Sequence, residues 1–312
     1  MIDYTKYRMN QLNSACAEFI RQESSGSLLL MLATIIAMVL ANSPMAESYE
    51  HALHLFVDLP LLPDMSLLHW VNDGLMAIFF LVVGMEIKRE FLFGELKSLS
   101  ATLLPITAAV GGMLIPAALH SLFNMGGPTA QGWAIPMSTD IAFSLGVLAF
   151  VAKRVPRSVI VFLTALAIVD DLGGIVVIAL FYSTSIQWTA LSAGLAVLMV
   201  MALFSWRNVH HPLPYVLGGV VTWYAFYQAG IHPTVAGVLT GFLIPAGTEN
   251  TQHSHPLHLW EHKLSPWSAF LIMPIFALGN AGTSMTSESF ASLASPIGLG
   301  IIAGLFLGKA LG

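Results

Sequence analysis

The chain has 312 residues, of which 56% are hydrophobic and only 9% are charged, and its formal net charge is −5. Soluble domains carry about 25% charged residues, so the composition excludes a soluble globular protein, and it offers no basic surface for binding nucleic acid. Apolar runs of roughly 17–25 residues recur along the chain and can cross a bilayer as helices. A single cysteine, Cys16, excludes an internal disulfide framework. The sequence predicts an all-α polytopic membrane protein.

Ten membrane spans are predicted in chain order, after a polar N-terminal segment that we interpret as a cytoplasmic lead-in. Because no soluble insertion separates the spans, residues 1–312 are predicted to form one transmembrane domain. The predicted spans are 24–41, 69–87, 101–123, 133–151, 158–182, 188–206, 213–230, 233–246, 266–282 and 296–312.

The positions of Lys and Arg predict the orientation of these spans. Eleven of the twelve basic residues fall in the N-terminal segment and in the loops after even-numbered spans, and the loops after odd-numbered spans contain none. Cytoplasmic loops of membrane proteins are enriched in Lys and Arg, so the N-terminus is predicted to be cytoplasmic. The twelfth basic residue, Lys309, lies inside the last span.

Span two carries charged residues at both of its ends. Asp73, near the outer end, is interpreted either as a hydrated residue at the mouth of a pathway or as a cap at the helix start. The stretch GMEIKRE at the cytoplasmic end contains Glu86, Arg89 and Glu90. On charge pattern alone these residues are typical of a solvated anchor.

Span four contains a mid-membrane aspartate beside a helix-breaking sequence. It reads WAIPMSTDIAFSLGVLAFVA, in which Pro136 removes a backbone donor and Asp140 lies eight residues from the outer end. The stretch PMSTD predicts either a broken helix, whose free carbonyls and helix ends can bind an ion, or a simple proline kink.

Span five places Asp170 and Asp171 in the apolar run ALAIVDDLGGIVVIAL. A carboxylate at the bilayer centre costs about 2.5–3.5 kcal/mol on translocon scales. The pair predicts a cation or proton site, and the alternative is a pair of hydrogen-bonded residues that only tie helices together. Lys309 is predicted to pair with Asp170, and the alternative is an ammonium that reaches the inner interface.

Five segments resemble the NhaA-type bacterial sodium/proton antiporters, and the likeness runs from about residue 24 to the last residue. The segments are WVNDGLMAIFFLVVGMEIKRE, GWAIPMSTDIAFSLGVLA, ALAIVDDLGGIVVIALFY, GIHPTVAGVLTGF and GIIAGLFLGKALG. The resemblance implies a transporter of the bacterial inner membrane, and neither an enzyme nor a protein that needs a cofactor.

The resemblance also implies roles for individual residues. Asp170 and Asp171 would bind Na⁺, Asp140 and Thr139 would complete the site from an unwound helix, and Lys309 would pair with Asp170. Asp73 would lie in the periplasmic funnel. The residues implied in the pH response are Glu86, Arg89, Glu90, His232 and Glu261.

The resemblance further implies a homodimer, held through a β-hairpin in the connection 42–68 and surrounded by membrane lipid. The family fold has twelve spans built on inverted repeats of three helices, and the second repeat would begin at span ten. The chain is therefore expected to be C-terminally truncated, to lack the last two spans and the second broken helix, and to transport poorly.

The predicted activity is the electrogenic exchange of cytoplasmic Na⁺ or Li⁺ for external H⁺, regulated by pH and serving sodium and pH homeostasis. Buried carboxylates hold protons readily, and Na⁺ can replace those protons as the charge partner. Two alternatives are an intramembrane aspartyl protease, whose usual Gly-x-Gly-Asp signature is absent here, and a passive cation channel.

Overall fold

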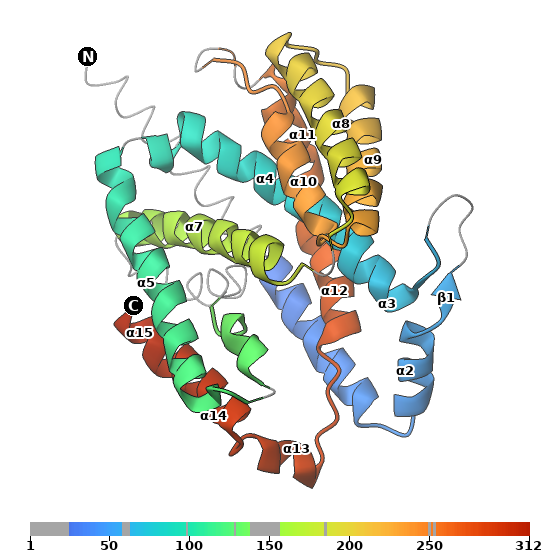
Figure 1. Cartoon of the computed structure of the whole chain (residues 1–312), viewed down its shortest axis with the longest axis vertical. Coiled ribbons are helices and arrows are strands. Elements are labelled where there is room, and N and C mark those ends of the chain that lie inside the picture. The colour runs from blue at the N-terminus through green and yellow to red at the C-terminus, as the bar shows by residue number, and fades with distance from the viewer. Residues whose placement is uncertain are drawn as a thin grey trace.

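The computed structural model describes residues 25–57, 63–97, 99–127, 129–137, 157–183, 186–248, 251 and 254–312. These residues are predominantly helical, as the composition predicts, and they form two groups of helices (Figure 1). In the first group α10 packs against α4, α8 and α9, and α11 packs against α4; in the second α5 packs with α7, α14 and α15. Alanine and leucine side chains of the N-terminal helix Ser25–Ala41 pack against α12.

The helices have the following bounds. They are α2 (Ala46–Leu53), α3 (Leu67–His69), α4 (Met76–Phe93), α5 (Leu99–Asn124), α7 (Arg157–Phe181), α8 (Trp188–Trp206), α9 (Leu213–Ala229), α10 (Thr234–Leu243), α11 (Pro256–Trp267), α12 (Met273–Asn280), α13 (Ser287–Ser292), α14 (Pro296–Ala303) and α15 (Lys309–Leu311).

Helices occupy nine of the ten predicted spans within the described residues, and most of the span 133–151 lies outside them. Among the described residues, four helices are long and apolar enough to cross a membrane on their own. A fifth span results if Ser25–Ala41 and Ala46–Leu53, which meet at 117°, are counted together. The full number of ten spans stays a prediction.

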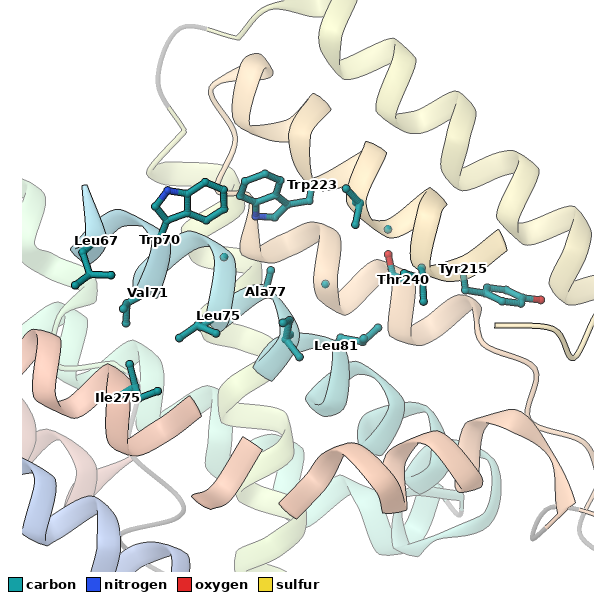
Figure 2. A pocket seen from close by; sticks show the side chains of 16 residues that line it. Leu67, Trp70, Val71, Leu75, Ala77, Leu81, Tyr215, Trp223, Thr240 and Ile275 are labelled. Carbon is teal, nitrogen blue, oxygen red and sulfur yellow. The ribbon is translucent and has the colours of Figure 1, made fainter. Parts of the chain in front are cut away.

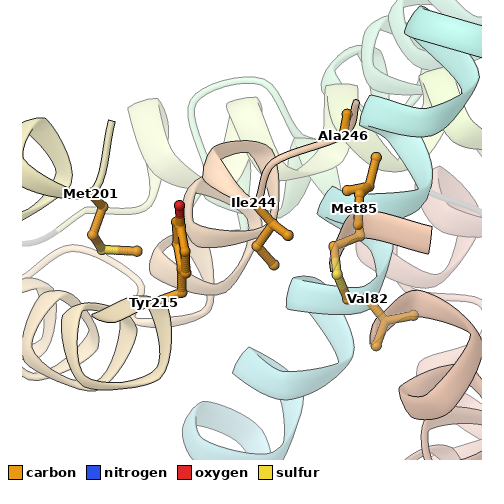
Figure 3. Packing of buried hydrophobic residues seen from close by; sticks show 7 residues of the cluster. Val82, Met85, Met201, Tyr215, Ile244 and Ala246 are labelled. Atoms are coloured by element: carbon orange, nitrogen blue, oxygen red, sulfur yellow. The ribbon is translucent and has the colours of Figure 1, made fainter. Parts of the chain in front are cut away.

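The core of the first group joins five helices that are far apart in the sequence. Figure 3 shows Met85 of α4, Met201 of α8, Tyr215 of α9 and Ile244 at the end of α10 packed in one buried cluster, which Leu257 of α11 completes. The Tyr215 hydroxyl donates a hydrogen bond to the Val209 carbonyl at 3.1 Å, so its polar end is satisfied inside the cluster.

Glycines bring α4 and α10 into backbone contact. A Cβ on Gly84 would lie 2.5 Å from the Val238 carbonyl oxygen, and one on Gly241 would lie 2.6 Å from the Leu81 carbonyl oxygen. Small residues four apart are a common basis of helix association in membranes, and Gly237 and Gly241 have this spacing on α10.

The two groups meet where α7 packs against α4. Val83 and Ile87 of α4 share a buried cluster with Ala165 and Ile168 of α7. Ile168 precedes Asp170 by two residues, so this apolar contact fixes the part of α7 that carries the paired aspartates.

In the part of the chain that the structure describes, three helices each contain one π-helical turn, in which a backbone N–H donates five residues back. The turns are Trp70–Leu75 before α4, Ser268–Ile272 between α11 and α12, and Gly304–Gly308 between α14 and α15. A π turn inserts one residue into a helix and is frequent at functional sites. Two of the three turns contain or adjoin a residue of the predicted site, Asp73 and Lys309.

The connection 42–68 contains the predicted hairpin in a short form. Strand β1 (Phe56–Val57) pairs antiparallel with β2 (Met65–Ser66), with Phe56 opposite Ser66. Helix α2, which the sequence analysis did not predict, occupies the start of this connection and has no buried residue.

Candidate functional site

The centre of the site is a buried ion pair between Asp170 and Lys309. Lys309 Nζ donates to both carboxylate oxygens of Asp170, at 3.2 Å to Oδ1 and 3.1 Å to Oδ2. Asp170 is 5% exposed, and the Lys309 side chain is 22% exposed. The predicted pairing is confirmed. The alternative, in which Lys309 extends to the interface, is wrong, because the ammonium satisfies an otherwise buried charge.

The π turn Gly304–Gly308 directly precedes Lys309. The Lys309 N–H donates to the Gly304 carbonyl, five residues back, where a regular α-helix would bond to residue 305. One inserted residue rotates everything that follows by about 100° relative to the preceding helix. The turn therefore sets the direction in which the Lys309 side chain leaves α15.

Close contact with α5 holds this turn in place. A Cβ on Gly308 would lie 2.7 Å from Pro116 Cα, and one on Gly304 would lie 3.2 Å from the Pro116 carbonyl oxygen. Pro116 also has no N–H to donate to the Gly112 carbonyl one turn earlier. Gly112 itself lies beside Lys309, with a built Cβ 3.9 Å from Nζ. The ammonium thus lies where α5 has an interrupted backbone ladder.

The remaining ligands predicted from sequence are placed only in part. Asp171 follows Asp170 on α7, is partly exposed and has an interaction of its own. Adjacent helical residues point about 100° apart, so Asp171 faces a different direction from the Lys309 contact. Thr139 and Asp140 lie outside the described residues. Pro136, which precedes them, packs near Gly304.

Asp73 lies inside the π turn Trp70–Leu75, not at a helix start. The cap of this helix is Ser66, whose side chain accepts from the His69 N–H, so the interpretation of Asp73 as a cap is wrong. Trp223 Nε1 donates to the Asp73 carbonyl at 2.7 Å. His232 Nδ1 lies 3.9 Å from Asp73 Oδ1, which brings two of the predicted residues together.

Arg89, Glu90 and Glu261 form a charged cluster between α4 and α11. Arg89 Nε donates to Glu261 at 2.9 and 3.1 Å, and Arg89 Nη1 lies 2.7 Å from Glu90 Oε1. Glu86 adds to the negative potential at this guanidinium. The partly buried contact between two helices shows that the interpretation as a solvated anchor is incomplete.

Glu261, on α11, has an environment that favours its neutral form. Burial raises the pKa of Glu261 above its ordinary value, and Arg89 beside it opposes that rise. Glu90 raises the Glu261 pKa further by repulsion. Lys88 completes this end of α4 by donating to the Ile244 carbonyl at 2.6 Å, at the C-terminal end of α10.

An apolar cleft of about 690 Å³ lies between α4, α9 and α10, away from the elements that carry the ion pair. Figure 2 shows Trp70 and Trp223 stacked at one end and Tyr215 at the other, with the Thr240 hydroxyl as one of its few polar groups. A hard cation needs several oxygen ligands, so this cleft does not have the chemistry of an ion site.

Sequence reasoning missed a polar cluster at the far end of α5. His120 is fully buried, and Asn124 is 3% exposed. Asn124 donates to the carbonyls of His120 and Pro296, both at 3.0 Å, and accepts from the Thr129 hydroxyl at 2.6 Å. The signal was a histidine and an asparagine four residues apart inside an apolar span.

A buried Asp–Lys pair between two membrane helices, beside an interrupted helix, is typical of a membrane protein that moves ions or protons. Residues 17–312 match the family described as Na+/H+ antiporter 1. The chain belongs to this family of NhaA antiporters, and it is a multi-pass membrane transporter for Na⁺ and H⁺, not an enzyme.

Individual relatives are similar over almost the whole chain. The chain is 48% identical to "Na(+)/H(+) antiporter NhaA 1" of Clostridium beijerinckii, over 97% of this chain and 77% of the relative. It is 49% identical to "Na(+)/H(+) antiporter NhaA" of Vibrio vulnificus, over 96% and 76%. It is also 49% identical to the NhaA antiporter of Vibrio cholerae, over 95% and 76%.

Proposed function

We propose that the chain exchanges cytoplasmic Na⁺ or Li⁺ for external protons across the bacterial inner membrane, with its N-terminus in the cytoplasm. The observation that carries this proposal is the buried pair of Asp170 and Lys309. The Lys309 ammonium binds the Asp170 carboxylate, which would otherwise attract another cation. Na⁺ and the Lys309 proton therefore compete for the same negative charge.

The proposed exchange cycle follows from this competition. Asp170 and Asp171 bind the dehydrated ion through oxygen ligands, and Thr139 and Asp140 contribute further oxygens from span four. Entry of Na⁺ displaces the ammonium from Asp170, after which Lys309 releases one proton and a second carboxyl group of the site releases another. Loss of Na⁺ on the outer side allows protons to return. Two protons exchanged for one Na⁺ move net charge, so the membrane potential drives the cycle.

The rival functions have less support. An aspartyl protease needs two carboxylates that share a proton, whereas Asp170 is bound to an ammonium. A passive channel needs no titrating group at its ion site. No cofactor is required, because the transported ions carry the whole reaction.

The charged cluster at the cytoplasmic end supports pH regulation. Protonation of Glu261 weakens its bond to Arg89 and leaves the guanidinium with Glu90 alone, so acid would change the contact between α4 and α11. At the outer end, His232 Nδ1 lies 3.9 Å from Asp73 Oδ1. We further propose a homodimer through the connection 42–68, whose exposed Phe56 and Leu55 offer apolar surface to a second copy or to membrane lipid.

The test is Na⁺-dependent proton flux in proteoliposomes with an imposed proton gradient. Addition of Na⁺ or Li⁺ should collapse the gradient and K⁺ should not, and Asp171→Asn should abolish the response while the protein still inserts. One lost ligand charge leaves a dehydrated cation poorly compensated. Equal responses to Na⁺ and K⁺, or full transport by the variant, would contradict the proposal.

A further inference from the structure

His120 has an environment that stability alone does not explain. It is fully buried, and neither ring nitrogen forms a hydrogen bond with any described residue. A neutral imidazole carries one donor and one acceptor, and an unmet buried polar group costs about 1–3 kcal/mol. A phenylalanine would fill a similar volume without that cost.

The imidazole lies between two glycines on different elements. A Cβ on Gly132, in the turn Ala130–Ala134, would lie 3.3 Å from Nε2, and one on Gly300 of α14 would lie 3.1 Å from Cδ2. The ring therefore closes a seam where α5, α14 and the turn Ala130–Ala134 meet. We call this contact the outer seam. The distribution of Lys and Arg places the C-terminal end of α5, the start of α14 and the turn Ala130–Ala134 on the outer side of the membrane.

Among the described residues, those that line the closed seam carry no charge that could stabilise an imidazolium. His120 is the only ionisable side chain on α5, and α14 and the turn Ala130–Ala134 have none. Tyr182, which directly follows α7, reaches the turn and donates to the Gln131 carbonyl. Lys309 and Asp170 lie further in, roughly 13 Å along the helix from Gly300 at 1.5 Å per residue.

The cost of protonating His120 therefore differs between a closed and an open state of this seam. In the closed state the charged ring would be buried and unpaired, which is strongly unfavourable. In an open state the ring would be hydrated and could bind a proton at mildly acidic pH. A ligand that binds one state only shifts the equilibrium toward that state.

We propose that His120 is a proton-binding site of the outer seam, separate from the ion site, and that its protonation stabilises the open seam. External acid would then favour access from the side on which protons enter. No bond other than N–H changes: the ring gains one proton as the seam opens and returns it to water before the seam closes. The proposal rests on the proposed orientation and direction of exchange.

The test measures exposure of the seam directly. Ala117 is buried on α5, three residues before His120 and on the same helical face. Ala117→Cys, in a Cys16→Ser background, is labelled from outside with a membrane-impermeant maleimide at pH 5.5–8. Met125 is 78% exposed, so Met125→Cys serves as a reference site that corrects for the pH dependence of the thiol reaction.

The ratio of labelling at 117 to labelling at 125 should rise as the external pH falls. The change should occur at mildly acidic pH, with up to a tenfold change in the ratio for each pH unit. His120→Phe keeps the ring volume without nitrogens, and His120→Gln keeps hydrogen bonding without titrating. Both should make the ratio independent of pH.

Retention of the pH dependence in either variant, or its absence with His120 in place, would overturn the proposal. His51→Gln, an exposed histidine on the connection 42–68, serves as the control and should leave the ratio unchanged. Na⁺-dependent proton flux is measured in the same vesicles. If the labelling ratio depends on pH but Na⁺-dependent flux is absent, the proposed function alone is refuted. If flux is present but the labelling ratio does not change with pH, only the role of His120 is refuted.

Discussion

Replacing Lys309 by methionine should destabilise the protein through Asp170, not through lost packing. The ammonium donates two hydrogen bonds to a carboxylate that is 5% exposed. Removal of one partner of a buried pair costs about 3–5 kcal/mol, because it leaves the other charge uncompensated. Asp170→Asn should cost less, since Lys309 is 22% exposed and its long stem can carry the ammonium toward water.

The double variant with both substitutions should be more stable than Lys309→Met alone. Joint replacement of a buried pair by neutral groups removes the uncompensated charge. The two effects should therefore be non-additive, with a coupling energy of about 2–3 kcal/mol, near the top of the range for residues in contact. Asp73→Asn is the control, because its partner His232 is half exposed at 3.9 Å and should contribute at most about 1 kcal/mol.

Thermal unfolding in detergent micelles compares these variants. At about 2 °C or more per kcal/mol, Lys309→Met should lower the midpoint by roughly 6–10 °C and Asp73→Asn by no more than about 2 °C. Additive effects of the two substitutions at the pair, or equal midpoints for Lys309→Met and Asp73→Asn, would refute the argument that the pair holds α7 against α15.

Two further predictions concern packing and pH. Gly308→Ala would place a methyl group 2.7 Å from Pro116 Cα, so it should destabilise the protein by about 1–3 kcal/mol and slow exchange by displacing Lys309. The control Gly127→Ala, whose nearest neighbours are 3.7 Å away, should change neither stability nor exchange. Equal exchange rates for the two variants would contradict this prediction. Because burial raises the pKa of Glu261, its contribution to stability is fully present below its ordinary value of 4.5 and is lost as the pH rises through the raised value. Glu261→Gln cannot ionise, so melting between pH 4 and 8 should show a smaller pH slope than in the wild type; an unchanged slope would exclude Glu261 as its source.

The sequence alone determined the class of this protein and its costliest residues. Low charge and long apolar runs require a bilayer as the surrounding solvent. The alternation of Lys and Arg between loops predicts the orientation of the spans across the membrane. Asp170, Asp171 and Lys309 could be identified because an ionised group inside an apolar run is expensive wherever the helix packs. The family motifs around these residues then predicted the transported ions.

The tertiary structure decided how these residues meet. The π turn before Lys309 has no reliable sequence signature, because the extra residue is stabilised by packing of Gly304 and Gly308 on Pro116, which is almost 200 residues away in the chain. The hydrogen bond between Arg89 and Glu261 likewise forms only because α11 lies against α4 in the folded protein. His120 was hidden for the same reason: a lone histidine in an apolar span becomes informative only when every neighbour is known and none of those described pairs with its nitrogens.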